Sequence, residues 1–435
     1  MIDTAKDNRR VVERAILIGV RPPELDAAAA FEHLDELADL VANLGIGIVD
    51  RIVVNLKTPL AEYYVGTGKA EEIEARRAEL DADCLIFDTP LSPSQQRNWE
   101  KLTRSCVIDR EEVILEIFAT RATTREAVLQ VELARMQYTL PRLTRAWTHL
   151  SRQRGGVTGA RGQGETQIET DRRLLKRRIT ILTEELEALK KRRATERKRR
   201  ERSAIPHAAI VGYTNVGKSS LLRKLSGAEI FVADQLFATL DPTTRKVTLP
   251  DKQDVLLTDT VGFVRKLPHT LVEAFKSTLE AALQADFLIL LLDVSSSQLE
   301  AQWETTLAVL RELGAEDKNI IVAFNKMDRI DREAESVLLA RTRMLFPDSA
   351  YISTQTGEGL DELCRRIGSF AGTLRRLLRV TLPPRRHDLA ALAHAEGTVF
   401  EENYDDHGNL RLIFSIGPQH QHKFADFFDE ENHEK

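Results

Sequence analysis

The sequence predicts a multidomain α/β protein that contains a doubly wound parallel sheet, a second and smaller α/β unit, and a long helical hairpin between the two. Between residues 207 and 370, six strand-like apolar runs alternate with helical stretches, a pattern typical of a doubly wound sheet. Residues 1–120 show a shorter alternation of the same kind. Because 435 residues exceed one ordinary hydrophobic core, several domains are expected.

The N-terminal segment, residues 1–120, is predicted to form a small α/β domain. Strand-like runs occupy Ala15–Val20, Ile48–Asn55 and Cys84–Asp88, and the stretches between them have helical periods. Glycines at Gly66–Lys69 ("GTGK") precede one of these helical stretches but lack the spacing of a phosphate-binding loop, so a turn is the favoured interpretation.

Residues 121–203 are predicted to form an antiparallel helical hairpin. Apolar residues recur in steps of four and three from Leu129 to Leu150, and again from Ile168 to Leu189. Two such stripes joined by one glycine-rich loop indicate that each helix is buried against the other. Pro141 should kink or interrupt the first helix, and a second helix over Ile168–Arg200 would extend roughly 50 Å.

Positive charge is concentrated in this hairpin. From Arg142 to Arg202 there are 19 Lys and Arg against 8 Asp and Glu, although the whole chain has a net charge of −5. Like charges at helical spacing repel one another, so this run favours a polyanion such as RNA; a solvated helical linker and a plain hairpin turn are the alternatives. The RNA-binding candidates are Arg152, Arg154, Arg161, Gln163, Lys190, Lys191, Arg192, Arg193, Arg197, Lys198, Arg199 and Arg200.

Composition indicates a soluble, cytoplasmic protein, expected as a monomer without stable membrane insertion. The longest apolar run, Phe287–Leu292, is too short to span a bilayer. Cys84, Cys106 and Cys364 have no metal-ligand spacing and are interpreted as buried apolar residues of a reducing compartment. Residues 373–435 are predicted to form a small α+β domain with a β-hairpin and an acidic tail.

A phosphate-binding loop is indicated by "GYTNVGKSS" at Gly212–Ser220, which follows a strand-like run and precedes a helical one. The glycines allow backbone N–H groups to point at phosphate oxygens, and the helix N-terminus adds the positive end of its dipole. Lys218 is expected to reach the β- and γ-phosphates, and Ser219 is expected to bind Mg²⁺.

Three further motifs follow, each at the end of a strand: "DTVG", "NKMD" and "ISTQTG" (Ile352–Gly357), the last of which lies where a loop would close on the base edge. "DTVG" supplies Asp259 for Mg²⁺ and Gly262 for the γ-phosphate. The carboxylate of Asp328 in "NKMD" can accept from guanine N1–H and N2–H₂, a donor pair that adenine lacks, so GTP is the expected substrate. These motifs predict a P-loop GTPase domain over residues 204–372. The predicted nucleotide-binding residues are Gly212, Tyr213, Thr214, Asn215, Val216, Gly217, Lys218, Ser219, Ser220, Asp259, Thr260, Val261, Gly262, Asn325, Lys326, Asp328, Ser353 and Thr354.

A switch segment is predicted at "FATLDPTTR", where a threonine would sense the γ-phosphate and Mg²⁺. Thr239 is the chosen residue, with Thr243 and Thr244 as alternatives. The catalytic candidates are therefore Lys218, Thr239 and Gly262, and the Mg²⁺ ligands are Ser219, Thr239 and Asp259.

The residue after "DTVG" is Phe263, where many GTPases place a glutamine that orients the attacking water. Phenylalanine can neither donate nor accept a hydrogen bond, so slow intrinsic hydrolysis is expected, with stimulation by a partner or a cation. Asn215 is a candidate for holding potassium, and the alternative is an amide that braces the loop.

At these residues the sequence resembles the HflX family of translation-factor-class GTPases. The resemblance rests on "GYTNVGKSSLL", "LFATLDPTTR", "LTDTVGFVRKLPHTLVEAFKSTLE" and "NKMD", together with the upstream "YYVGTGKAEEI" and "RGQGETQIETDRRLL". It covers approximately residues 10–375. Thr354 departs from the alanine that is usual in the last guanine motif, which leaves the base edge to backbone N–H groups and Ser353.

The resemblance implies a factor that docks on the large ribosomal subunit and its RNA, splits stalled ribosomes under stress, and hydrolyses GTP with stimulation by the ribosome. Some family members also bind ATP through the N-terminal region. Two alternatives stay open: a GTP-gated scaffold for a protein partner, and an ATP-assisted RNA-remodelling protein in ribosome assembly.

Overall fold

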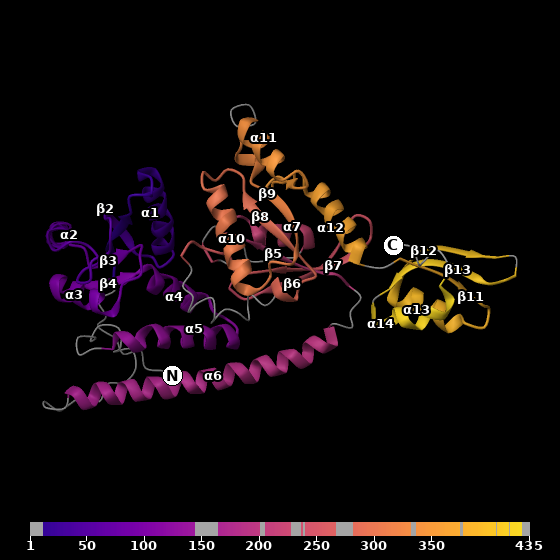
Figure 1. The fold of residues 1–435 in the computed structure, drawn as a ribbon, viewed down its shortest axis with the longest axis horizontal. Helices are drawn as coiled ribbons and strands as arrows, with labels where there is room; N and C mark the ends of the chain where they lie inside the picture. Colours follow the sequence, from indigo (N-terminus) through magenta and orange to yellow (C-terminus); the bar gives the residue numbers. More distant parts are fainter. Residues whose placement is uncertain are drawn as a thin grey trace, which may run out of the picture. The chain divides into compact units, whose positions relative to one another are not determined.

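The computed structural model describes residues 12–143, 164–200, 205–227, 236–237, 240–266, 282–331, 336–374, 377–405, 407–416 and 418–428 (Figure 1). The chain divides into two compact units. The first comprises Met1–Leu186, Ala233–Leu240 and Lys266–Phe275, and the second comprises Glu187–Val232, Asp241–Arg265 and Lys276–Lys435.

The first unit contains a four-stranded parallel sheet in the order β2-β1-β3-β4. Its strands are β1 (Arg14–Arg21), β2 (Gly47–Asn55), β3 (Cys84–Phe87) and β4 (Cys106–Asp109), and the helices between them are α1 (Ala27–Ala42), α2 (Thr67–Glu79) and α3 (Pro93–Thr103). The three predicted strands are confirmed. The fourth, β4, was not predicted, because an apolar run as short as "CVID" has no usable period.

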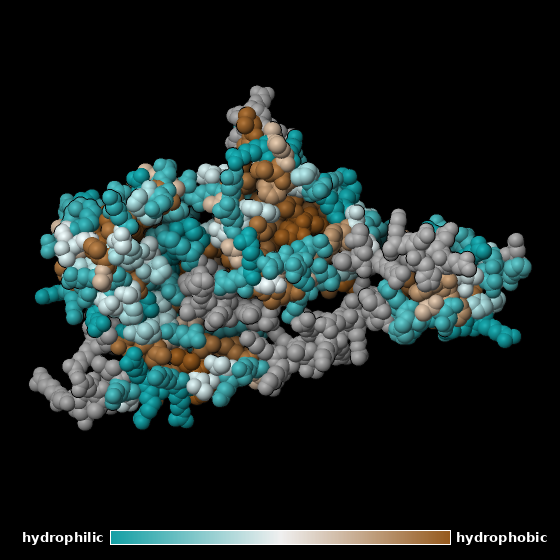
Figure 2. Space-filling view, in the orientation of Figure 1, coloured by the Kyte–Doolittle hydropathy of each residue, from teal (hydrophilic) through white to brown (hydrophobic). Residues whose placement is uncertain are grey.

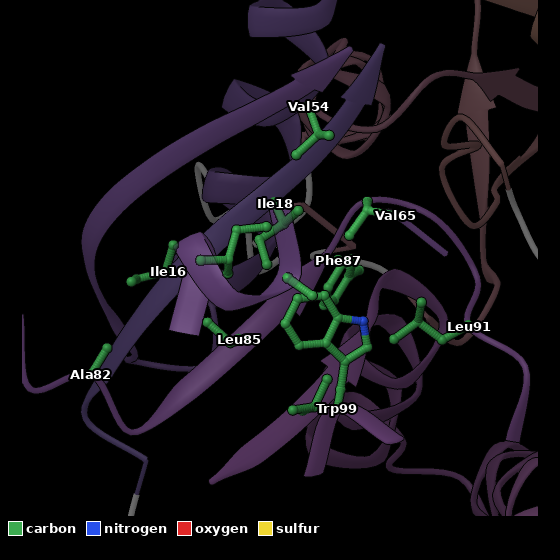
Figure 3. Close-up of a cluster of buried hydrophobic side chains, with 12 residues drawn as sticks. Ile16, Ile18, Val54, Val65, Ala82, Leu85, Phe87, Leu91 and Trp99 are labelled. Atoms are coloured by element: carbon green, nitrogen blue, oxygen red, sulfur yellow. The ribbon is translucent and has the colours of Figure 1, made fainter. Parts of the chain in front are cut away.

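The core on one side of this sheet is organised around Trp99 of α3, which is fully buried. Its ring lies 5.2 Å from the ring of Phe87 and 5.5 Å from that of Tyr63, measured between centroids. Figure 3 shows Trp99 beside Phe87, with Ile18 and Leu85 in the same cluster. The indole N–H donates to the Tyr63 carbonyl at 2.8 Å, so the one polar atom of the ring is satisfied despite its burial.

The helical part of the first unit follows β4. It comprises α4 (Arg110–Arg121), α5 (Arg125–Thr139), the 3₁₀ turn Leu140–Arg142 and the part of α6 (Gly164–Arg200) up to Leu186; the rest of α6 belongs to the second unit. The first arm is shorter than the predicted stripe to Leu150, because α5 ends at Thr139. Pro141 lies in the 3₁₀ turn, where its missing N–H costs no helical hydrogen bond, so the predicted interruption is confirmed. Trp147 and Leu150 lie outside the described residues.

The helices α5 and α6 pair antiparallel, as predicted. Arg178 of α6 donates to both carboxylate oxygens of Glu132 on α5, at 2.9 and 3.0 Å. Arg125 at the start of α5 pairs with Glu185, further along α6, which fixes the antiparallel sense. Leu182 of α6 is fully buried, and Figure 2 shows hydrophobic side chains along the seam of the two helices.

A buried polar network ties the end of α5 to the parallel sheet. Arg142 Nε donates to Gln96 Oε1 at 3.0 Å, and the guanidinium lies 3.5 Å from the centroid of the Tyr138 ring. The Tyr138 hydroxyl lies 3.1 Å from Asp109 Oδ1 and 3.2 Å from Glu112 Oε2. Burial raises the pKa of Glu112 to about 8, with a further contribution from Asp109, so Glu112 is protonated at neutral pH.

The second unit contains a six-stranded sheet in the order β10-β9-β8-β5-β7-β6, parallel except for β6. Its strands are β5 (His207–Gly212), β6 (Thr243–Thr248), β7 (Asp254–Asp259), β8 (Phe287–Asp293), β9 (Asn319–Asn325) and β10 (Ala350–Tyr351). Its described helices are α7 (Lys218–Ser226), α10 (Leu299–Leu313), the 3₁₀ turn Met327–Arg329, α11 (Ser336–Leu345) and α12 (Leu360–Leu374).

The chain reverses its direction of strand addition at β5, whose neighbours are β7 on one side and β8 on the other. In open α/β sheets, ligands bind at the carboxyl ends of the strands beside such a switch point. The predicted doubly wound domain is therefore confirmed, and its binding edge lies where β5, β7 and β8 end.

Figure 2 shows an exposed hydrophobic patch on α11, which carries the exposed Val337, Met344 and Leu345.

The small C-terminal α+β fold is also confirmed. An antiparallel sheet in the order β11-β13-β12 packs with α13 around Phe414 and Phe424, whose rings lie 4.8 Å apart. The predicted β-hairpin is formed by β12 and β13. The elements are β11 (Leu377–Leu382), α13 (His387–Glu396), β12 (Gly397–Tyr404), β13 (Leu410–Ile416), α14 (Pro418–Gln421) and the 3₁₀ turn His422–Phe427.

None of the helices in the described ranges is both long and apolar enough to cross a bilayer. Cys84 and Cys364 are buried free thiols, as interpreted from the sequence. Cys106 is only half buried, because β4 is the edge strand of its sheet, so the interpretation was wrong at that position. No metal-binding cluster of His, Cys, Asp or Glu occurs among the residues that the structure describes.

Candidate nucleotide site

The P-loop occupies the switch point, between the end of β5 and the start of α7. Gly212 and Gly217 have φ values of 149° and 97°, conformations that favour glycine. A Cβ on Gly212 would lie 2.3 Å from the Leu291 carbonyl oxygen, so the loop leaves the sheet where only glycine fits. Because α7 begins at Lys218, the N–H groups at its N-terminus follow the loop directly and point toward the place of the phosphate oxygens.

Lys218 is buried within the P-loop that precedes it. Its Nζ donates to the Tyr213 carbonyl at 2.7 Å and to the Gly212 carbonyl at 3.3 Å. Burial lowers the pKa of Lys218 to about 8, and the carboxylate of Asp259 opposes this shift. A phosphate beside Nζ would supply the counter-charge that neutral carbonyl groups lack, so nucleotide binding would favour the charged lysine.

Ser219 and Asp259 bring two oxygen ligands together. Ser219 Oγ donates to Asp259 Oδ2 at 2.6 Å, where the first turn of α7 meets the end of β7. A hydroxyl and a carboxylate are hard oxygen donors of the kind that Mg²⁺ prefers, so this pair fits the ion and would hold it beside the phosphates. Bound Mg²⁺ supplies a Lewis acid that neutralises charge on the phosphate oxygens. Thr239, the third predicted ligand, lies outside the described residues.

Gly262 is enclosed by the P-loop. A Cβ at this position would lie 2.8 Å from each of Lys218 Nζ, Thr214 Cα and Thr214 Cγ2. Only a hydrogen atom fits there, so the N–H of Gly262 can approach a terminal phosphate oxygen that Lys218 also contacts. The two predicted catalytic residues among the described ones, Lys218 and Gly262, are therefore brought together.

Backbone hydrogen bonds join the segment after β7 to the P-loop. Phe263 N–H donates to the Gly212 carbonyl at 3.1 Å, and Thr214 N–H donates to the Phe263 carbonyl at 2.7 Å. The Tyr213 hydroxyl accepts from Arg265 N–H at 2.7 Å. The sequence pattern carried no signal for this role of Tyr213, because a P-loop tolerates any residue at that position.

Asn325 braces the base-binding side to the P-loop. Its Nδ2 donates to the Val216 carbonyl at 2.8 Å, and its Oδ1 accepts from Thr354 N–H at 3.0 Å. A Cβ on Gly217 would lie 2.4 Å from Asn325 Nδ2. Close packing, in addition to its positive φ, therefore requires glycine at this position. The predicted guanine motifs thus meet the phosphate motif through one amide side chain.

Asp328 is held by its neighbour in the last motif. Ser353 Oγ donates to Asp328 Oδ1 at 2.5 Å, which leaves further lone pairs for two guanine N–H donors. Lys326 adopts a φ of 68° and pairs with Asp293 at the end of β8, at 2.7 Å. Asp293, which holds Lys326 in place, was not predicted from the sequence. Its position at the end of β8, on the binding edge of the sheet, could have indicated it.

The other predicted site residues have these positions. Ser220 lies in the first turn of α7, and the Thr260 hydroxyl donates to the Ile210 carbonyl at 2.7 Å inside the sheet. Val216 and Val261 are buried beside the loop, and Asn215 is exposed with a φ of 60°. Exposure of Asn215 leaves both of its predicted roles, cation ligand and loop brace, as predictions.

The RNA-binding candidates are placed only in part. Arg152, Arg154, Arg161 and Gln163 lie outside the described residues, and the candidates from Lys190 to Arg200 lie on the C-terminal part of α6. The "GTGK" stretch is the start of a helix and not a separate turn before it: Gly66 is the N-cap of α2, and Lys69, in its first turn, pairs with Glu72 at 2.6 Å.

A P-loop at a switch point, an Mg²⁺ pair, and an aspartate poised for guanine together define a P-loop GTPase. Residues 207–326 match the family described as 50S ribosome-binding GTPase. Residues 31–119 and 121–200 match the families described as the N-terminal and middle regions of a GTP-binding GTPase.

Curated relatives extend this match over almost the whole chain. GTPase HflX of Akkermansia muciniphila is 50% identical over 413 residues, which cover 93% of this chain and 94% of the relative. GTPase HflX of Lacrimispora saccharolytica is 44% identical over 92% of this chain and 93% of the relative, and that of Escherichia coli K12 is 39% identical over 88% and 89%. The chain belongs to the HflX family and is a GTPase, which converts GTP to GDP and phosphate.

Proposed function

We propose that this GTPase docks on the large ribosomal subunit and separates stalled ribosomes into subunits, under stress conditions, with GTP hydrolysis tied to its release. The observation that carries the proposal is the match of the GTPase domain to a family described as binding the 50S ribosome. The same description favours a ribosomal partner over a scaffold for another protein, and the experiments below distinguish splitting from ATP-assisted RNA remodelling in ribosome assembly.

The second arm of the hairpin supports a nucleic-acid partner. Four basic side chains on α6, Arg172, Arg173, Lys176 and Arg177, are exposed within two turns. Lys and Arg at this density suit phosphate groups, which they bind without reading base sequence. The buried network around Arg142 holds the end of α5 in place, so the loop between the arms would start from a fixed point on the first unit.

The GTP site would act as the timer of this reaction. With GTP bound, the N–H of Gly262 and the hydroxyl of Thr239 would hold the switch segments closed, and loss of the γ-phosphate would release them. Phe263 supports slow hydrolysis until the ribosome stimulates it. Asn215 would be the ligand for a potassium ion, if one assists; equal turnover in potassium and in sodium would exclude that assistance.

The decisive experiment is sedimentation of intact ribosomes with the protein and a non-hydrolysable GTP analogue. The proposal expects a rise in free subunits, with binding that weakens steeply as salt is raised. An unchanged ratio of subunits to intact ribosomes would contradict splitting. ATP-dependent RNA unwinding that survives Lys218→Ala would instead favour the RNA-remodelling alternative.

A matched pair of variants tests the role of α6. The double substitution Arg172→Glu with Arg173→Glu should reduce ribosome binding at least about tenfold, because two phosphate contacts become repulsive. The control Arg341→Glu with Arg365→Glu makes the same change of charge on exposed side chains of α11 and α12. If both double variants bind alike, the basic face of α6 is not the contact surface.

A further inference from the structure

Hydrolysis of GTP requires a water molecule held in line with the γ-phosphorus, and Phe263 cannot hold it. Its side chain is 1% exposed and has no polar atom. Two hydrogen bonds to the P-loop fix its backbone. Its N–H donates to the Gly212 carbonyl at 3.1 Å, and its carbonyl accepts from the Thr214 N–H at 2.7 Å. A rotation that brought another group of this residue to the γ-phosphate would break both bonds.

Thr214, the third residue of the P-loop, carries a hydroxyl with no structural partner. The residue is 5% exposed, and its Oγ1 has no hydrogen-bond partner within the described part of the chain. Buried hydroxyls are almost always hydrogen-bonded to protein or to water, so one that the protein leaves without a partner marks a place for a water molecule or a ligand. The Thr214 backbone is itself fixed, since its N–H donates to Phe263.

The position of Thr214 matches the terminal phosphate. Thr214 Cα and Cγ2 lie at the same 2.8 Å from a Cβ built on Gly262 as Lys218 Nζ does. The side chain therefore borders the space between the two groups that would hold the γ-phosphate. The Cγ2 methyl is the group that faces Gly262, and a 120° rotation about χ1 would bring the hydroxyl into its place while the methyl takes the place of the Cβ hydrogen.

Three other hydroxyls of the site are already engaged. Ser219 donates to Asp259, Ser353 donates to Asp328, and Thr260 donates to the carbonyl of Ile210. The first belongs to the Mg²⁺ pair, the second to base recognition and the third to the sheet. None of these three hydroxyls is therefore available to orient a water molecule at the γ-phosphate.

We propose that Thr214 is a catalytic residue whose hydroxyl accepts a hydrogen bond from the attacking water and orients it toward the γ-phosphorus. The water oxygen forms the new P–O bond, and the bond between the γ-phosphorus and the bridging oxygen breaks. The electron pair of that bond passes to GDP, and the water proton passes to a γ-phosphate oxygen. Thr214 gains and loses no proton, so its contribution is orientation alone.

The experiment compares Thr214→Val, which keeps the shape and removes the hydroxyl, with Thr214→Ser, which keeps the hydroxyl and removes the methyl. Single-turnover hydrolysis without ribosomes should slow at least about tenfold in Thr214→Val and stay within about threefold of the parent in Thr214→Ser. Affinity for fluorescent GDP should be unchanged in both, and only Thr214→Val should lose the tightening of GDP binding by aluminium fluoride.

Three results would overturn the assignment. One is an unchanged rate in Thr214→Val. Another is equal slowing in both variants, which would make the methyl responsible. The last is parallel loss of GDP affinity in Thr214→Val, which would place the hydroxyl in binding or folding. None of these readouts uses the ribosome, so they stand apart from the ribosome-splitting proposal.

Discussion

The Nδ2 of Asn325 donates to the carbonyl oxygen of Val216 across 2.8 Å, which joins the base-binding edge of the site to its phosphate-binding loop. Through Oδ1 the same amide accepts from the backbone of Thr354. One side chain thus links the base-binding and phosphate-binding parts of the site. A substitution that breaks this link should weaken nucleotide binding at both parts.

Asn325→Asp removes the donor to Val216 and keeps the acceptor for Thr354. We expect affinity for GDP to fall about tenfold or more, because a buried carbonyl loses its partner and a carboxylate oxygen takes the donor's place. Equilibrium titration with fluorescent GDP measures the loss. Asn319→Asp at the exposed start of β9 is the matched control, and equal affinities in the two variants would show that the brace is unimportant.

Asp328→Asn should change base preference. The carboxylate can accept from both N1–H and N2–H₂ of guanine, whereas an amide presents one acceptor and a donor that faces the N–H groups. GTP affinity should fall at least about a hundredfold, and xanthosine triphosphate, which has a carbonyl in place of the 2-amino group, should bind better than GTP. Competition between the two nucleotides gives the ratio, and a retained preference for GTP would contradict the assigned role.

Lys218 should take up a proton when the nucleotide binds at alkaline pH. Its pKa of about 8 in the free protein leaves it largely neutral at pH 8.5, and the phosphates favour the charged form. Affinity should therefore rise as pH falls toward 8, with little further gain below pH 7. Titration calorimetry in buffers of different ionisation enthalpy reports the uptake.

The control for this measurement is the permanently charged variant Lys218→Arg, which should show no lysine-linked uptake. Lys224→Arg, on the exposed face of the same helix, should behave like the parent protein. Identical proton uptake in the Lys218 and Lys224 variants would mean that another group takes up the proton.

Glu112 should make the first unit less stable as pH rises. Its folded pKa of about 8 exceeds the ordinary value of 4.5, so the folded state binds the extra proton between these values. The contribution of Glu112 to stability is then fully present below pH 4.5 and is lost, by up to about 1.4 kcal/mol per pH unit, as pH rises to 8. Glu112→Gln should remove that slope while it keeps the neighbours Tyr138 and Gln96.

Urea unfolding at pH 5, 6.5 and 8 tests this slope, with the fluorescence of Trp99 as the probe after Trp147 and Trp303 are replaced by Phe. Glu401→Gln, on the exposed strand β12, is the matched control and should leave the slope unchanged. A slope in Glu112→Gln equal to that of its parent would show that Glu112 is ionised in the folded state.

Strand-end motifs made most of the nucleotide site predictable. Asp259, Asn325 and Asp328 stand at or just after the ends of long apolar strands, and parallel strands bring their ends to one edge. The brace through Asn325, the bridge from Tyr213 to Arg265 and the unpaired hydroxyl of Thr214 were not predictable, because each depends on which atoms meet across the edge. Sequence spacing fixes neither rotamers nor contacts between loops.

The fold was predictable where the periods were long. The strand β8 and the pairing of α5 with α6 have clear apolar patterns, and both are confirmed. The four-residue β4 has none, and α5 ends at Thr139, just before Pro141, although the predicted stripe continues beyond that point. At that point the missing N–H of one residue outweighed the pattern around it.

The burial of Phe263 has an evolutionary consequence. A glutamine introduced there would inherit a side-chain position inside the protein, where its amide would lack partners and would not reach the water. Substitution at this position is therefore limited by volume and polarity, and an apolar residue of similar size is the exchange that burial favours. No single mutation at residue 263 converts this enzyme into a hydrolase of the glutamine type, so faster hydrolysis would have to arise elsewhere in the chain or from a partner.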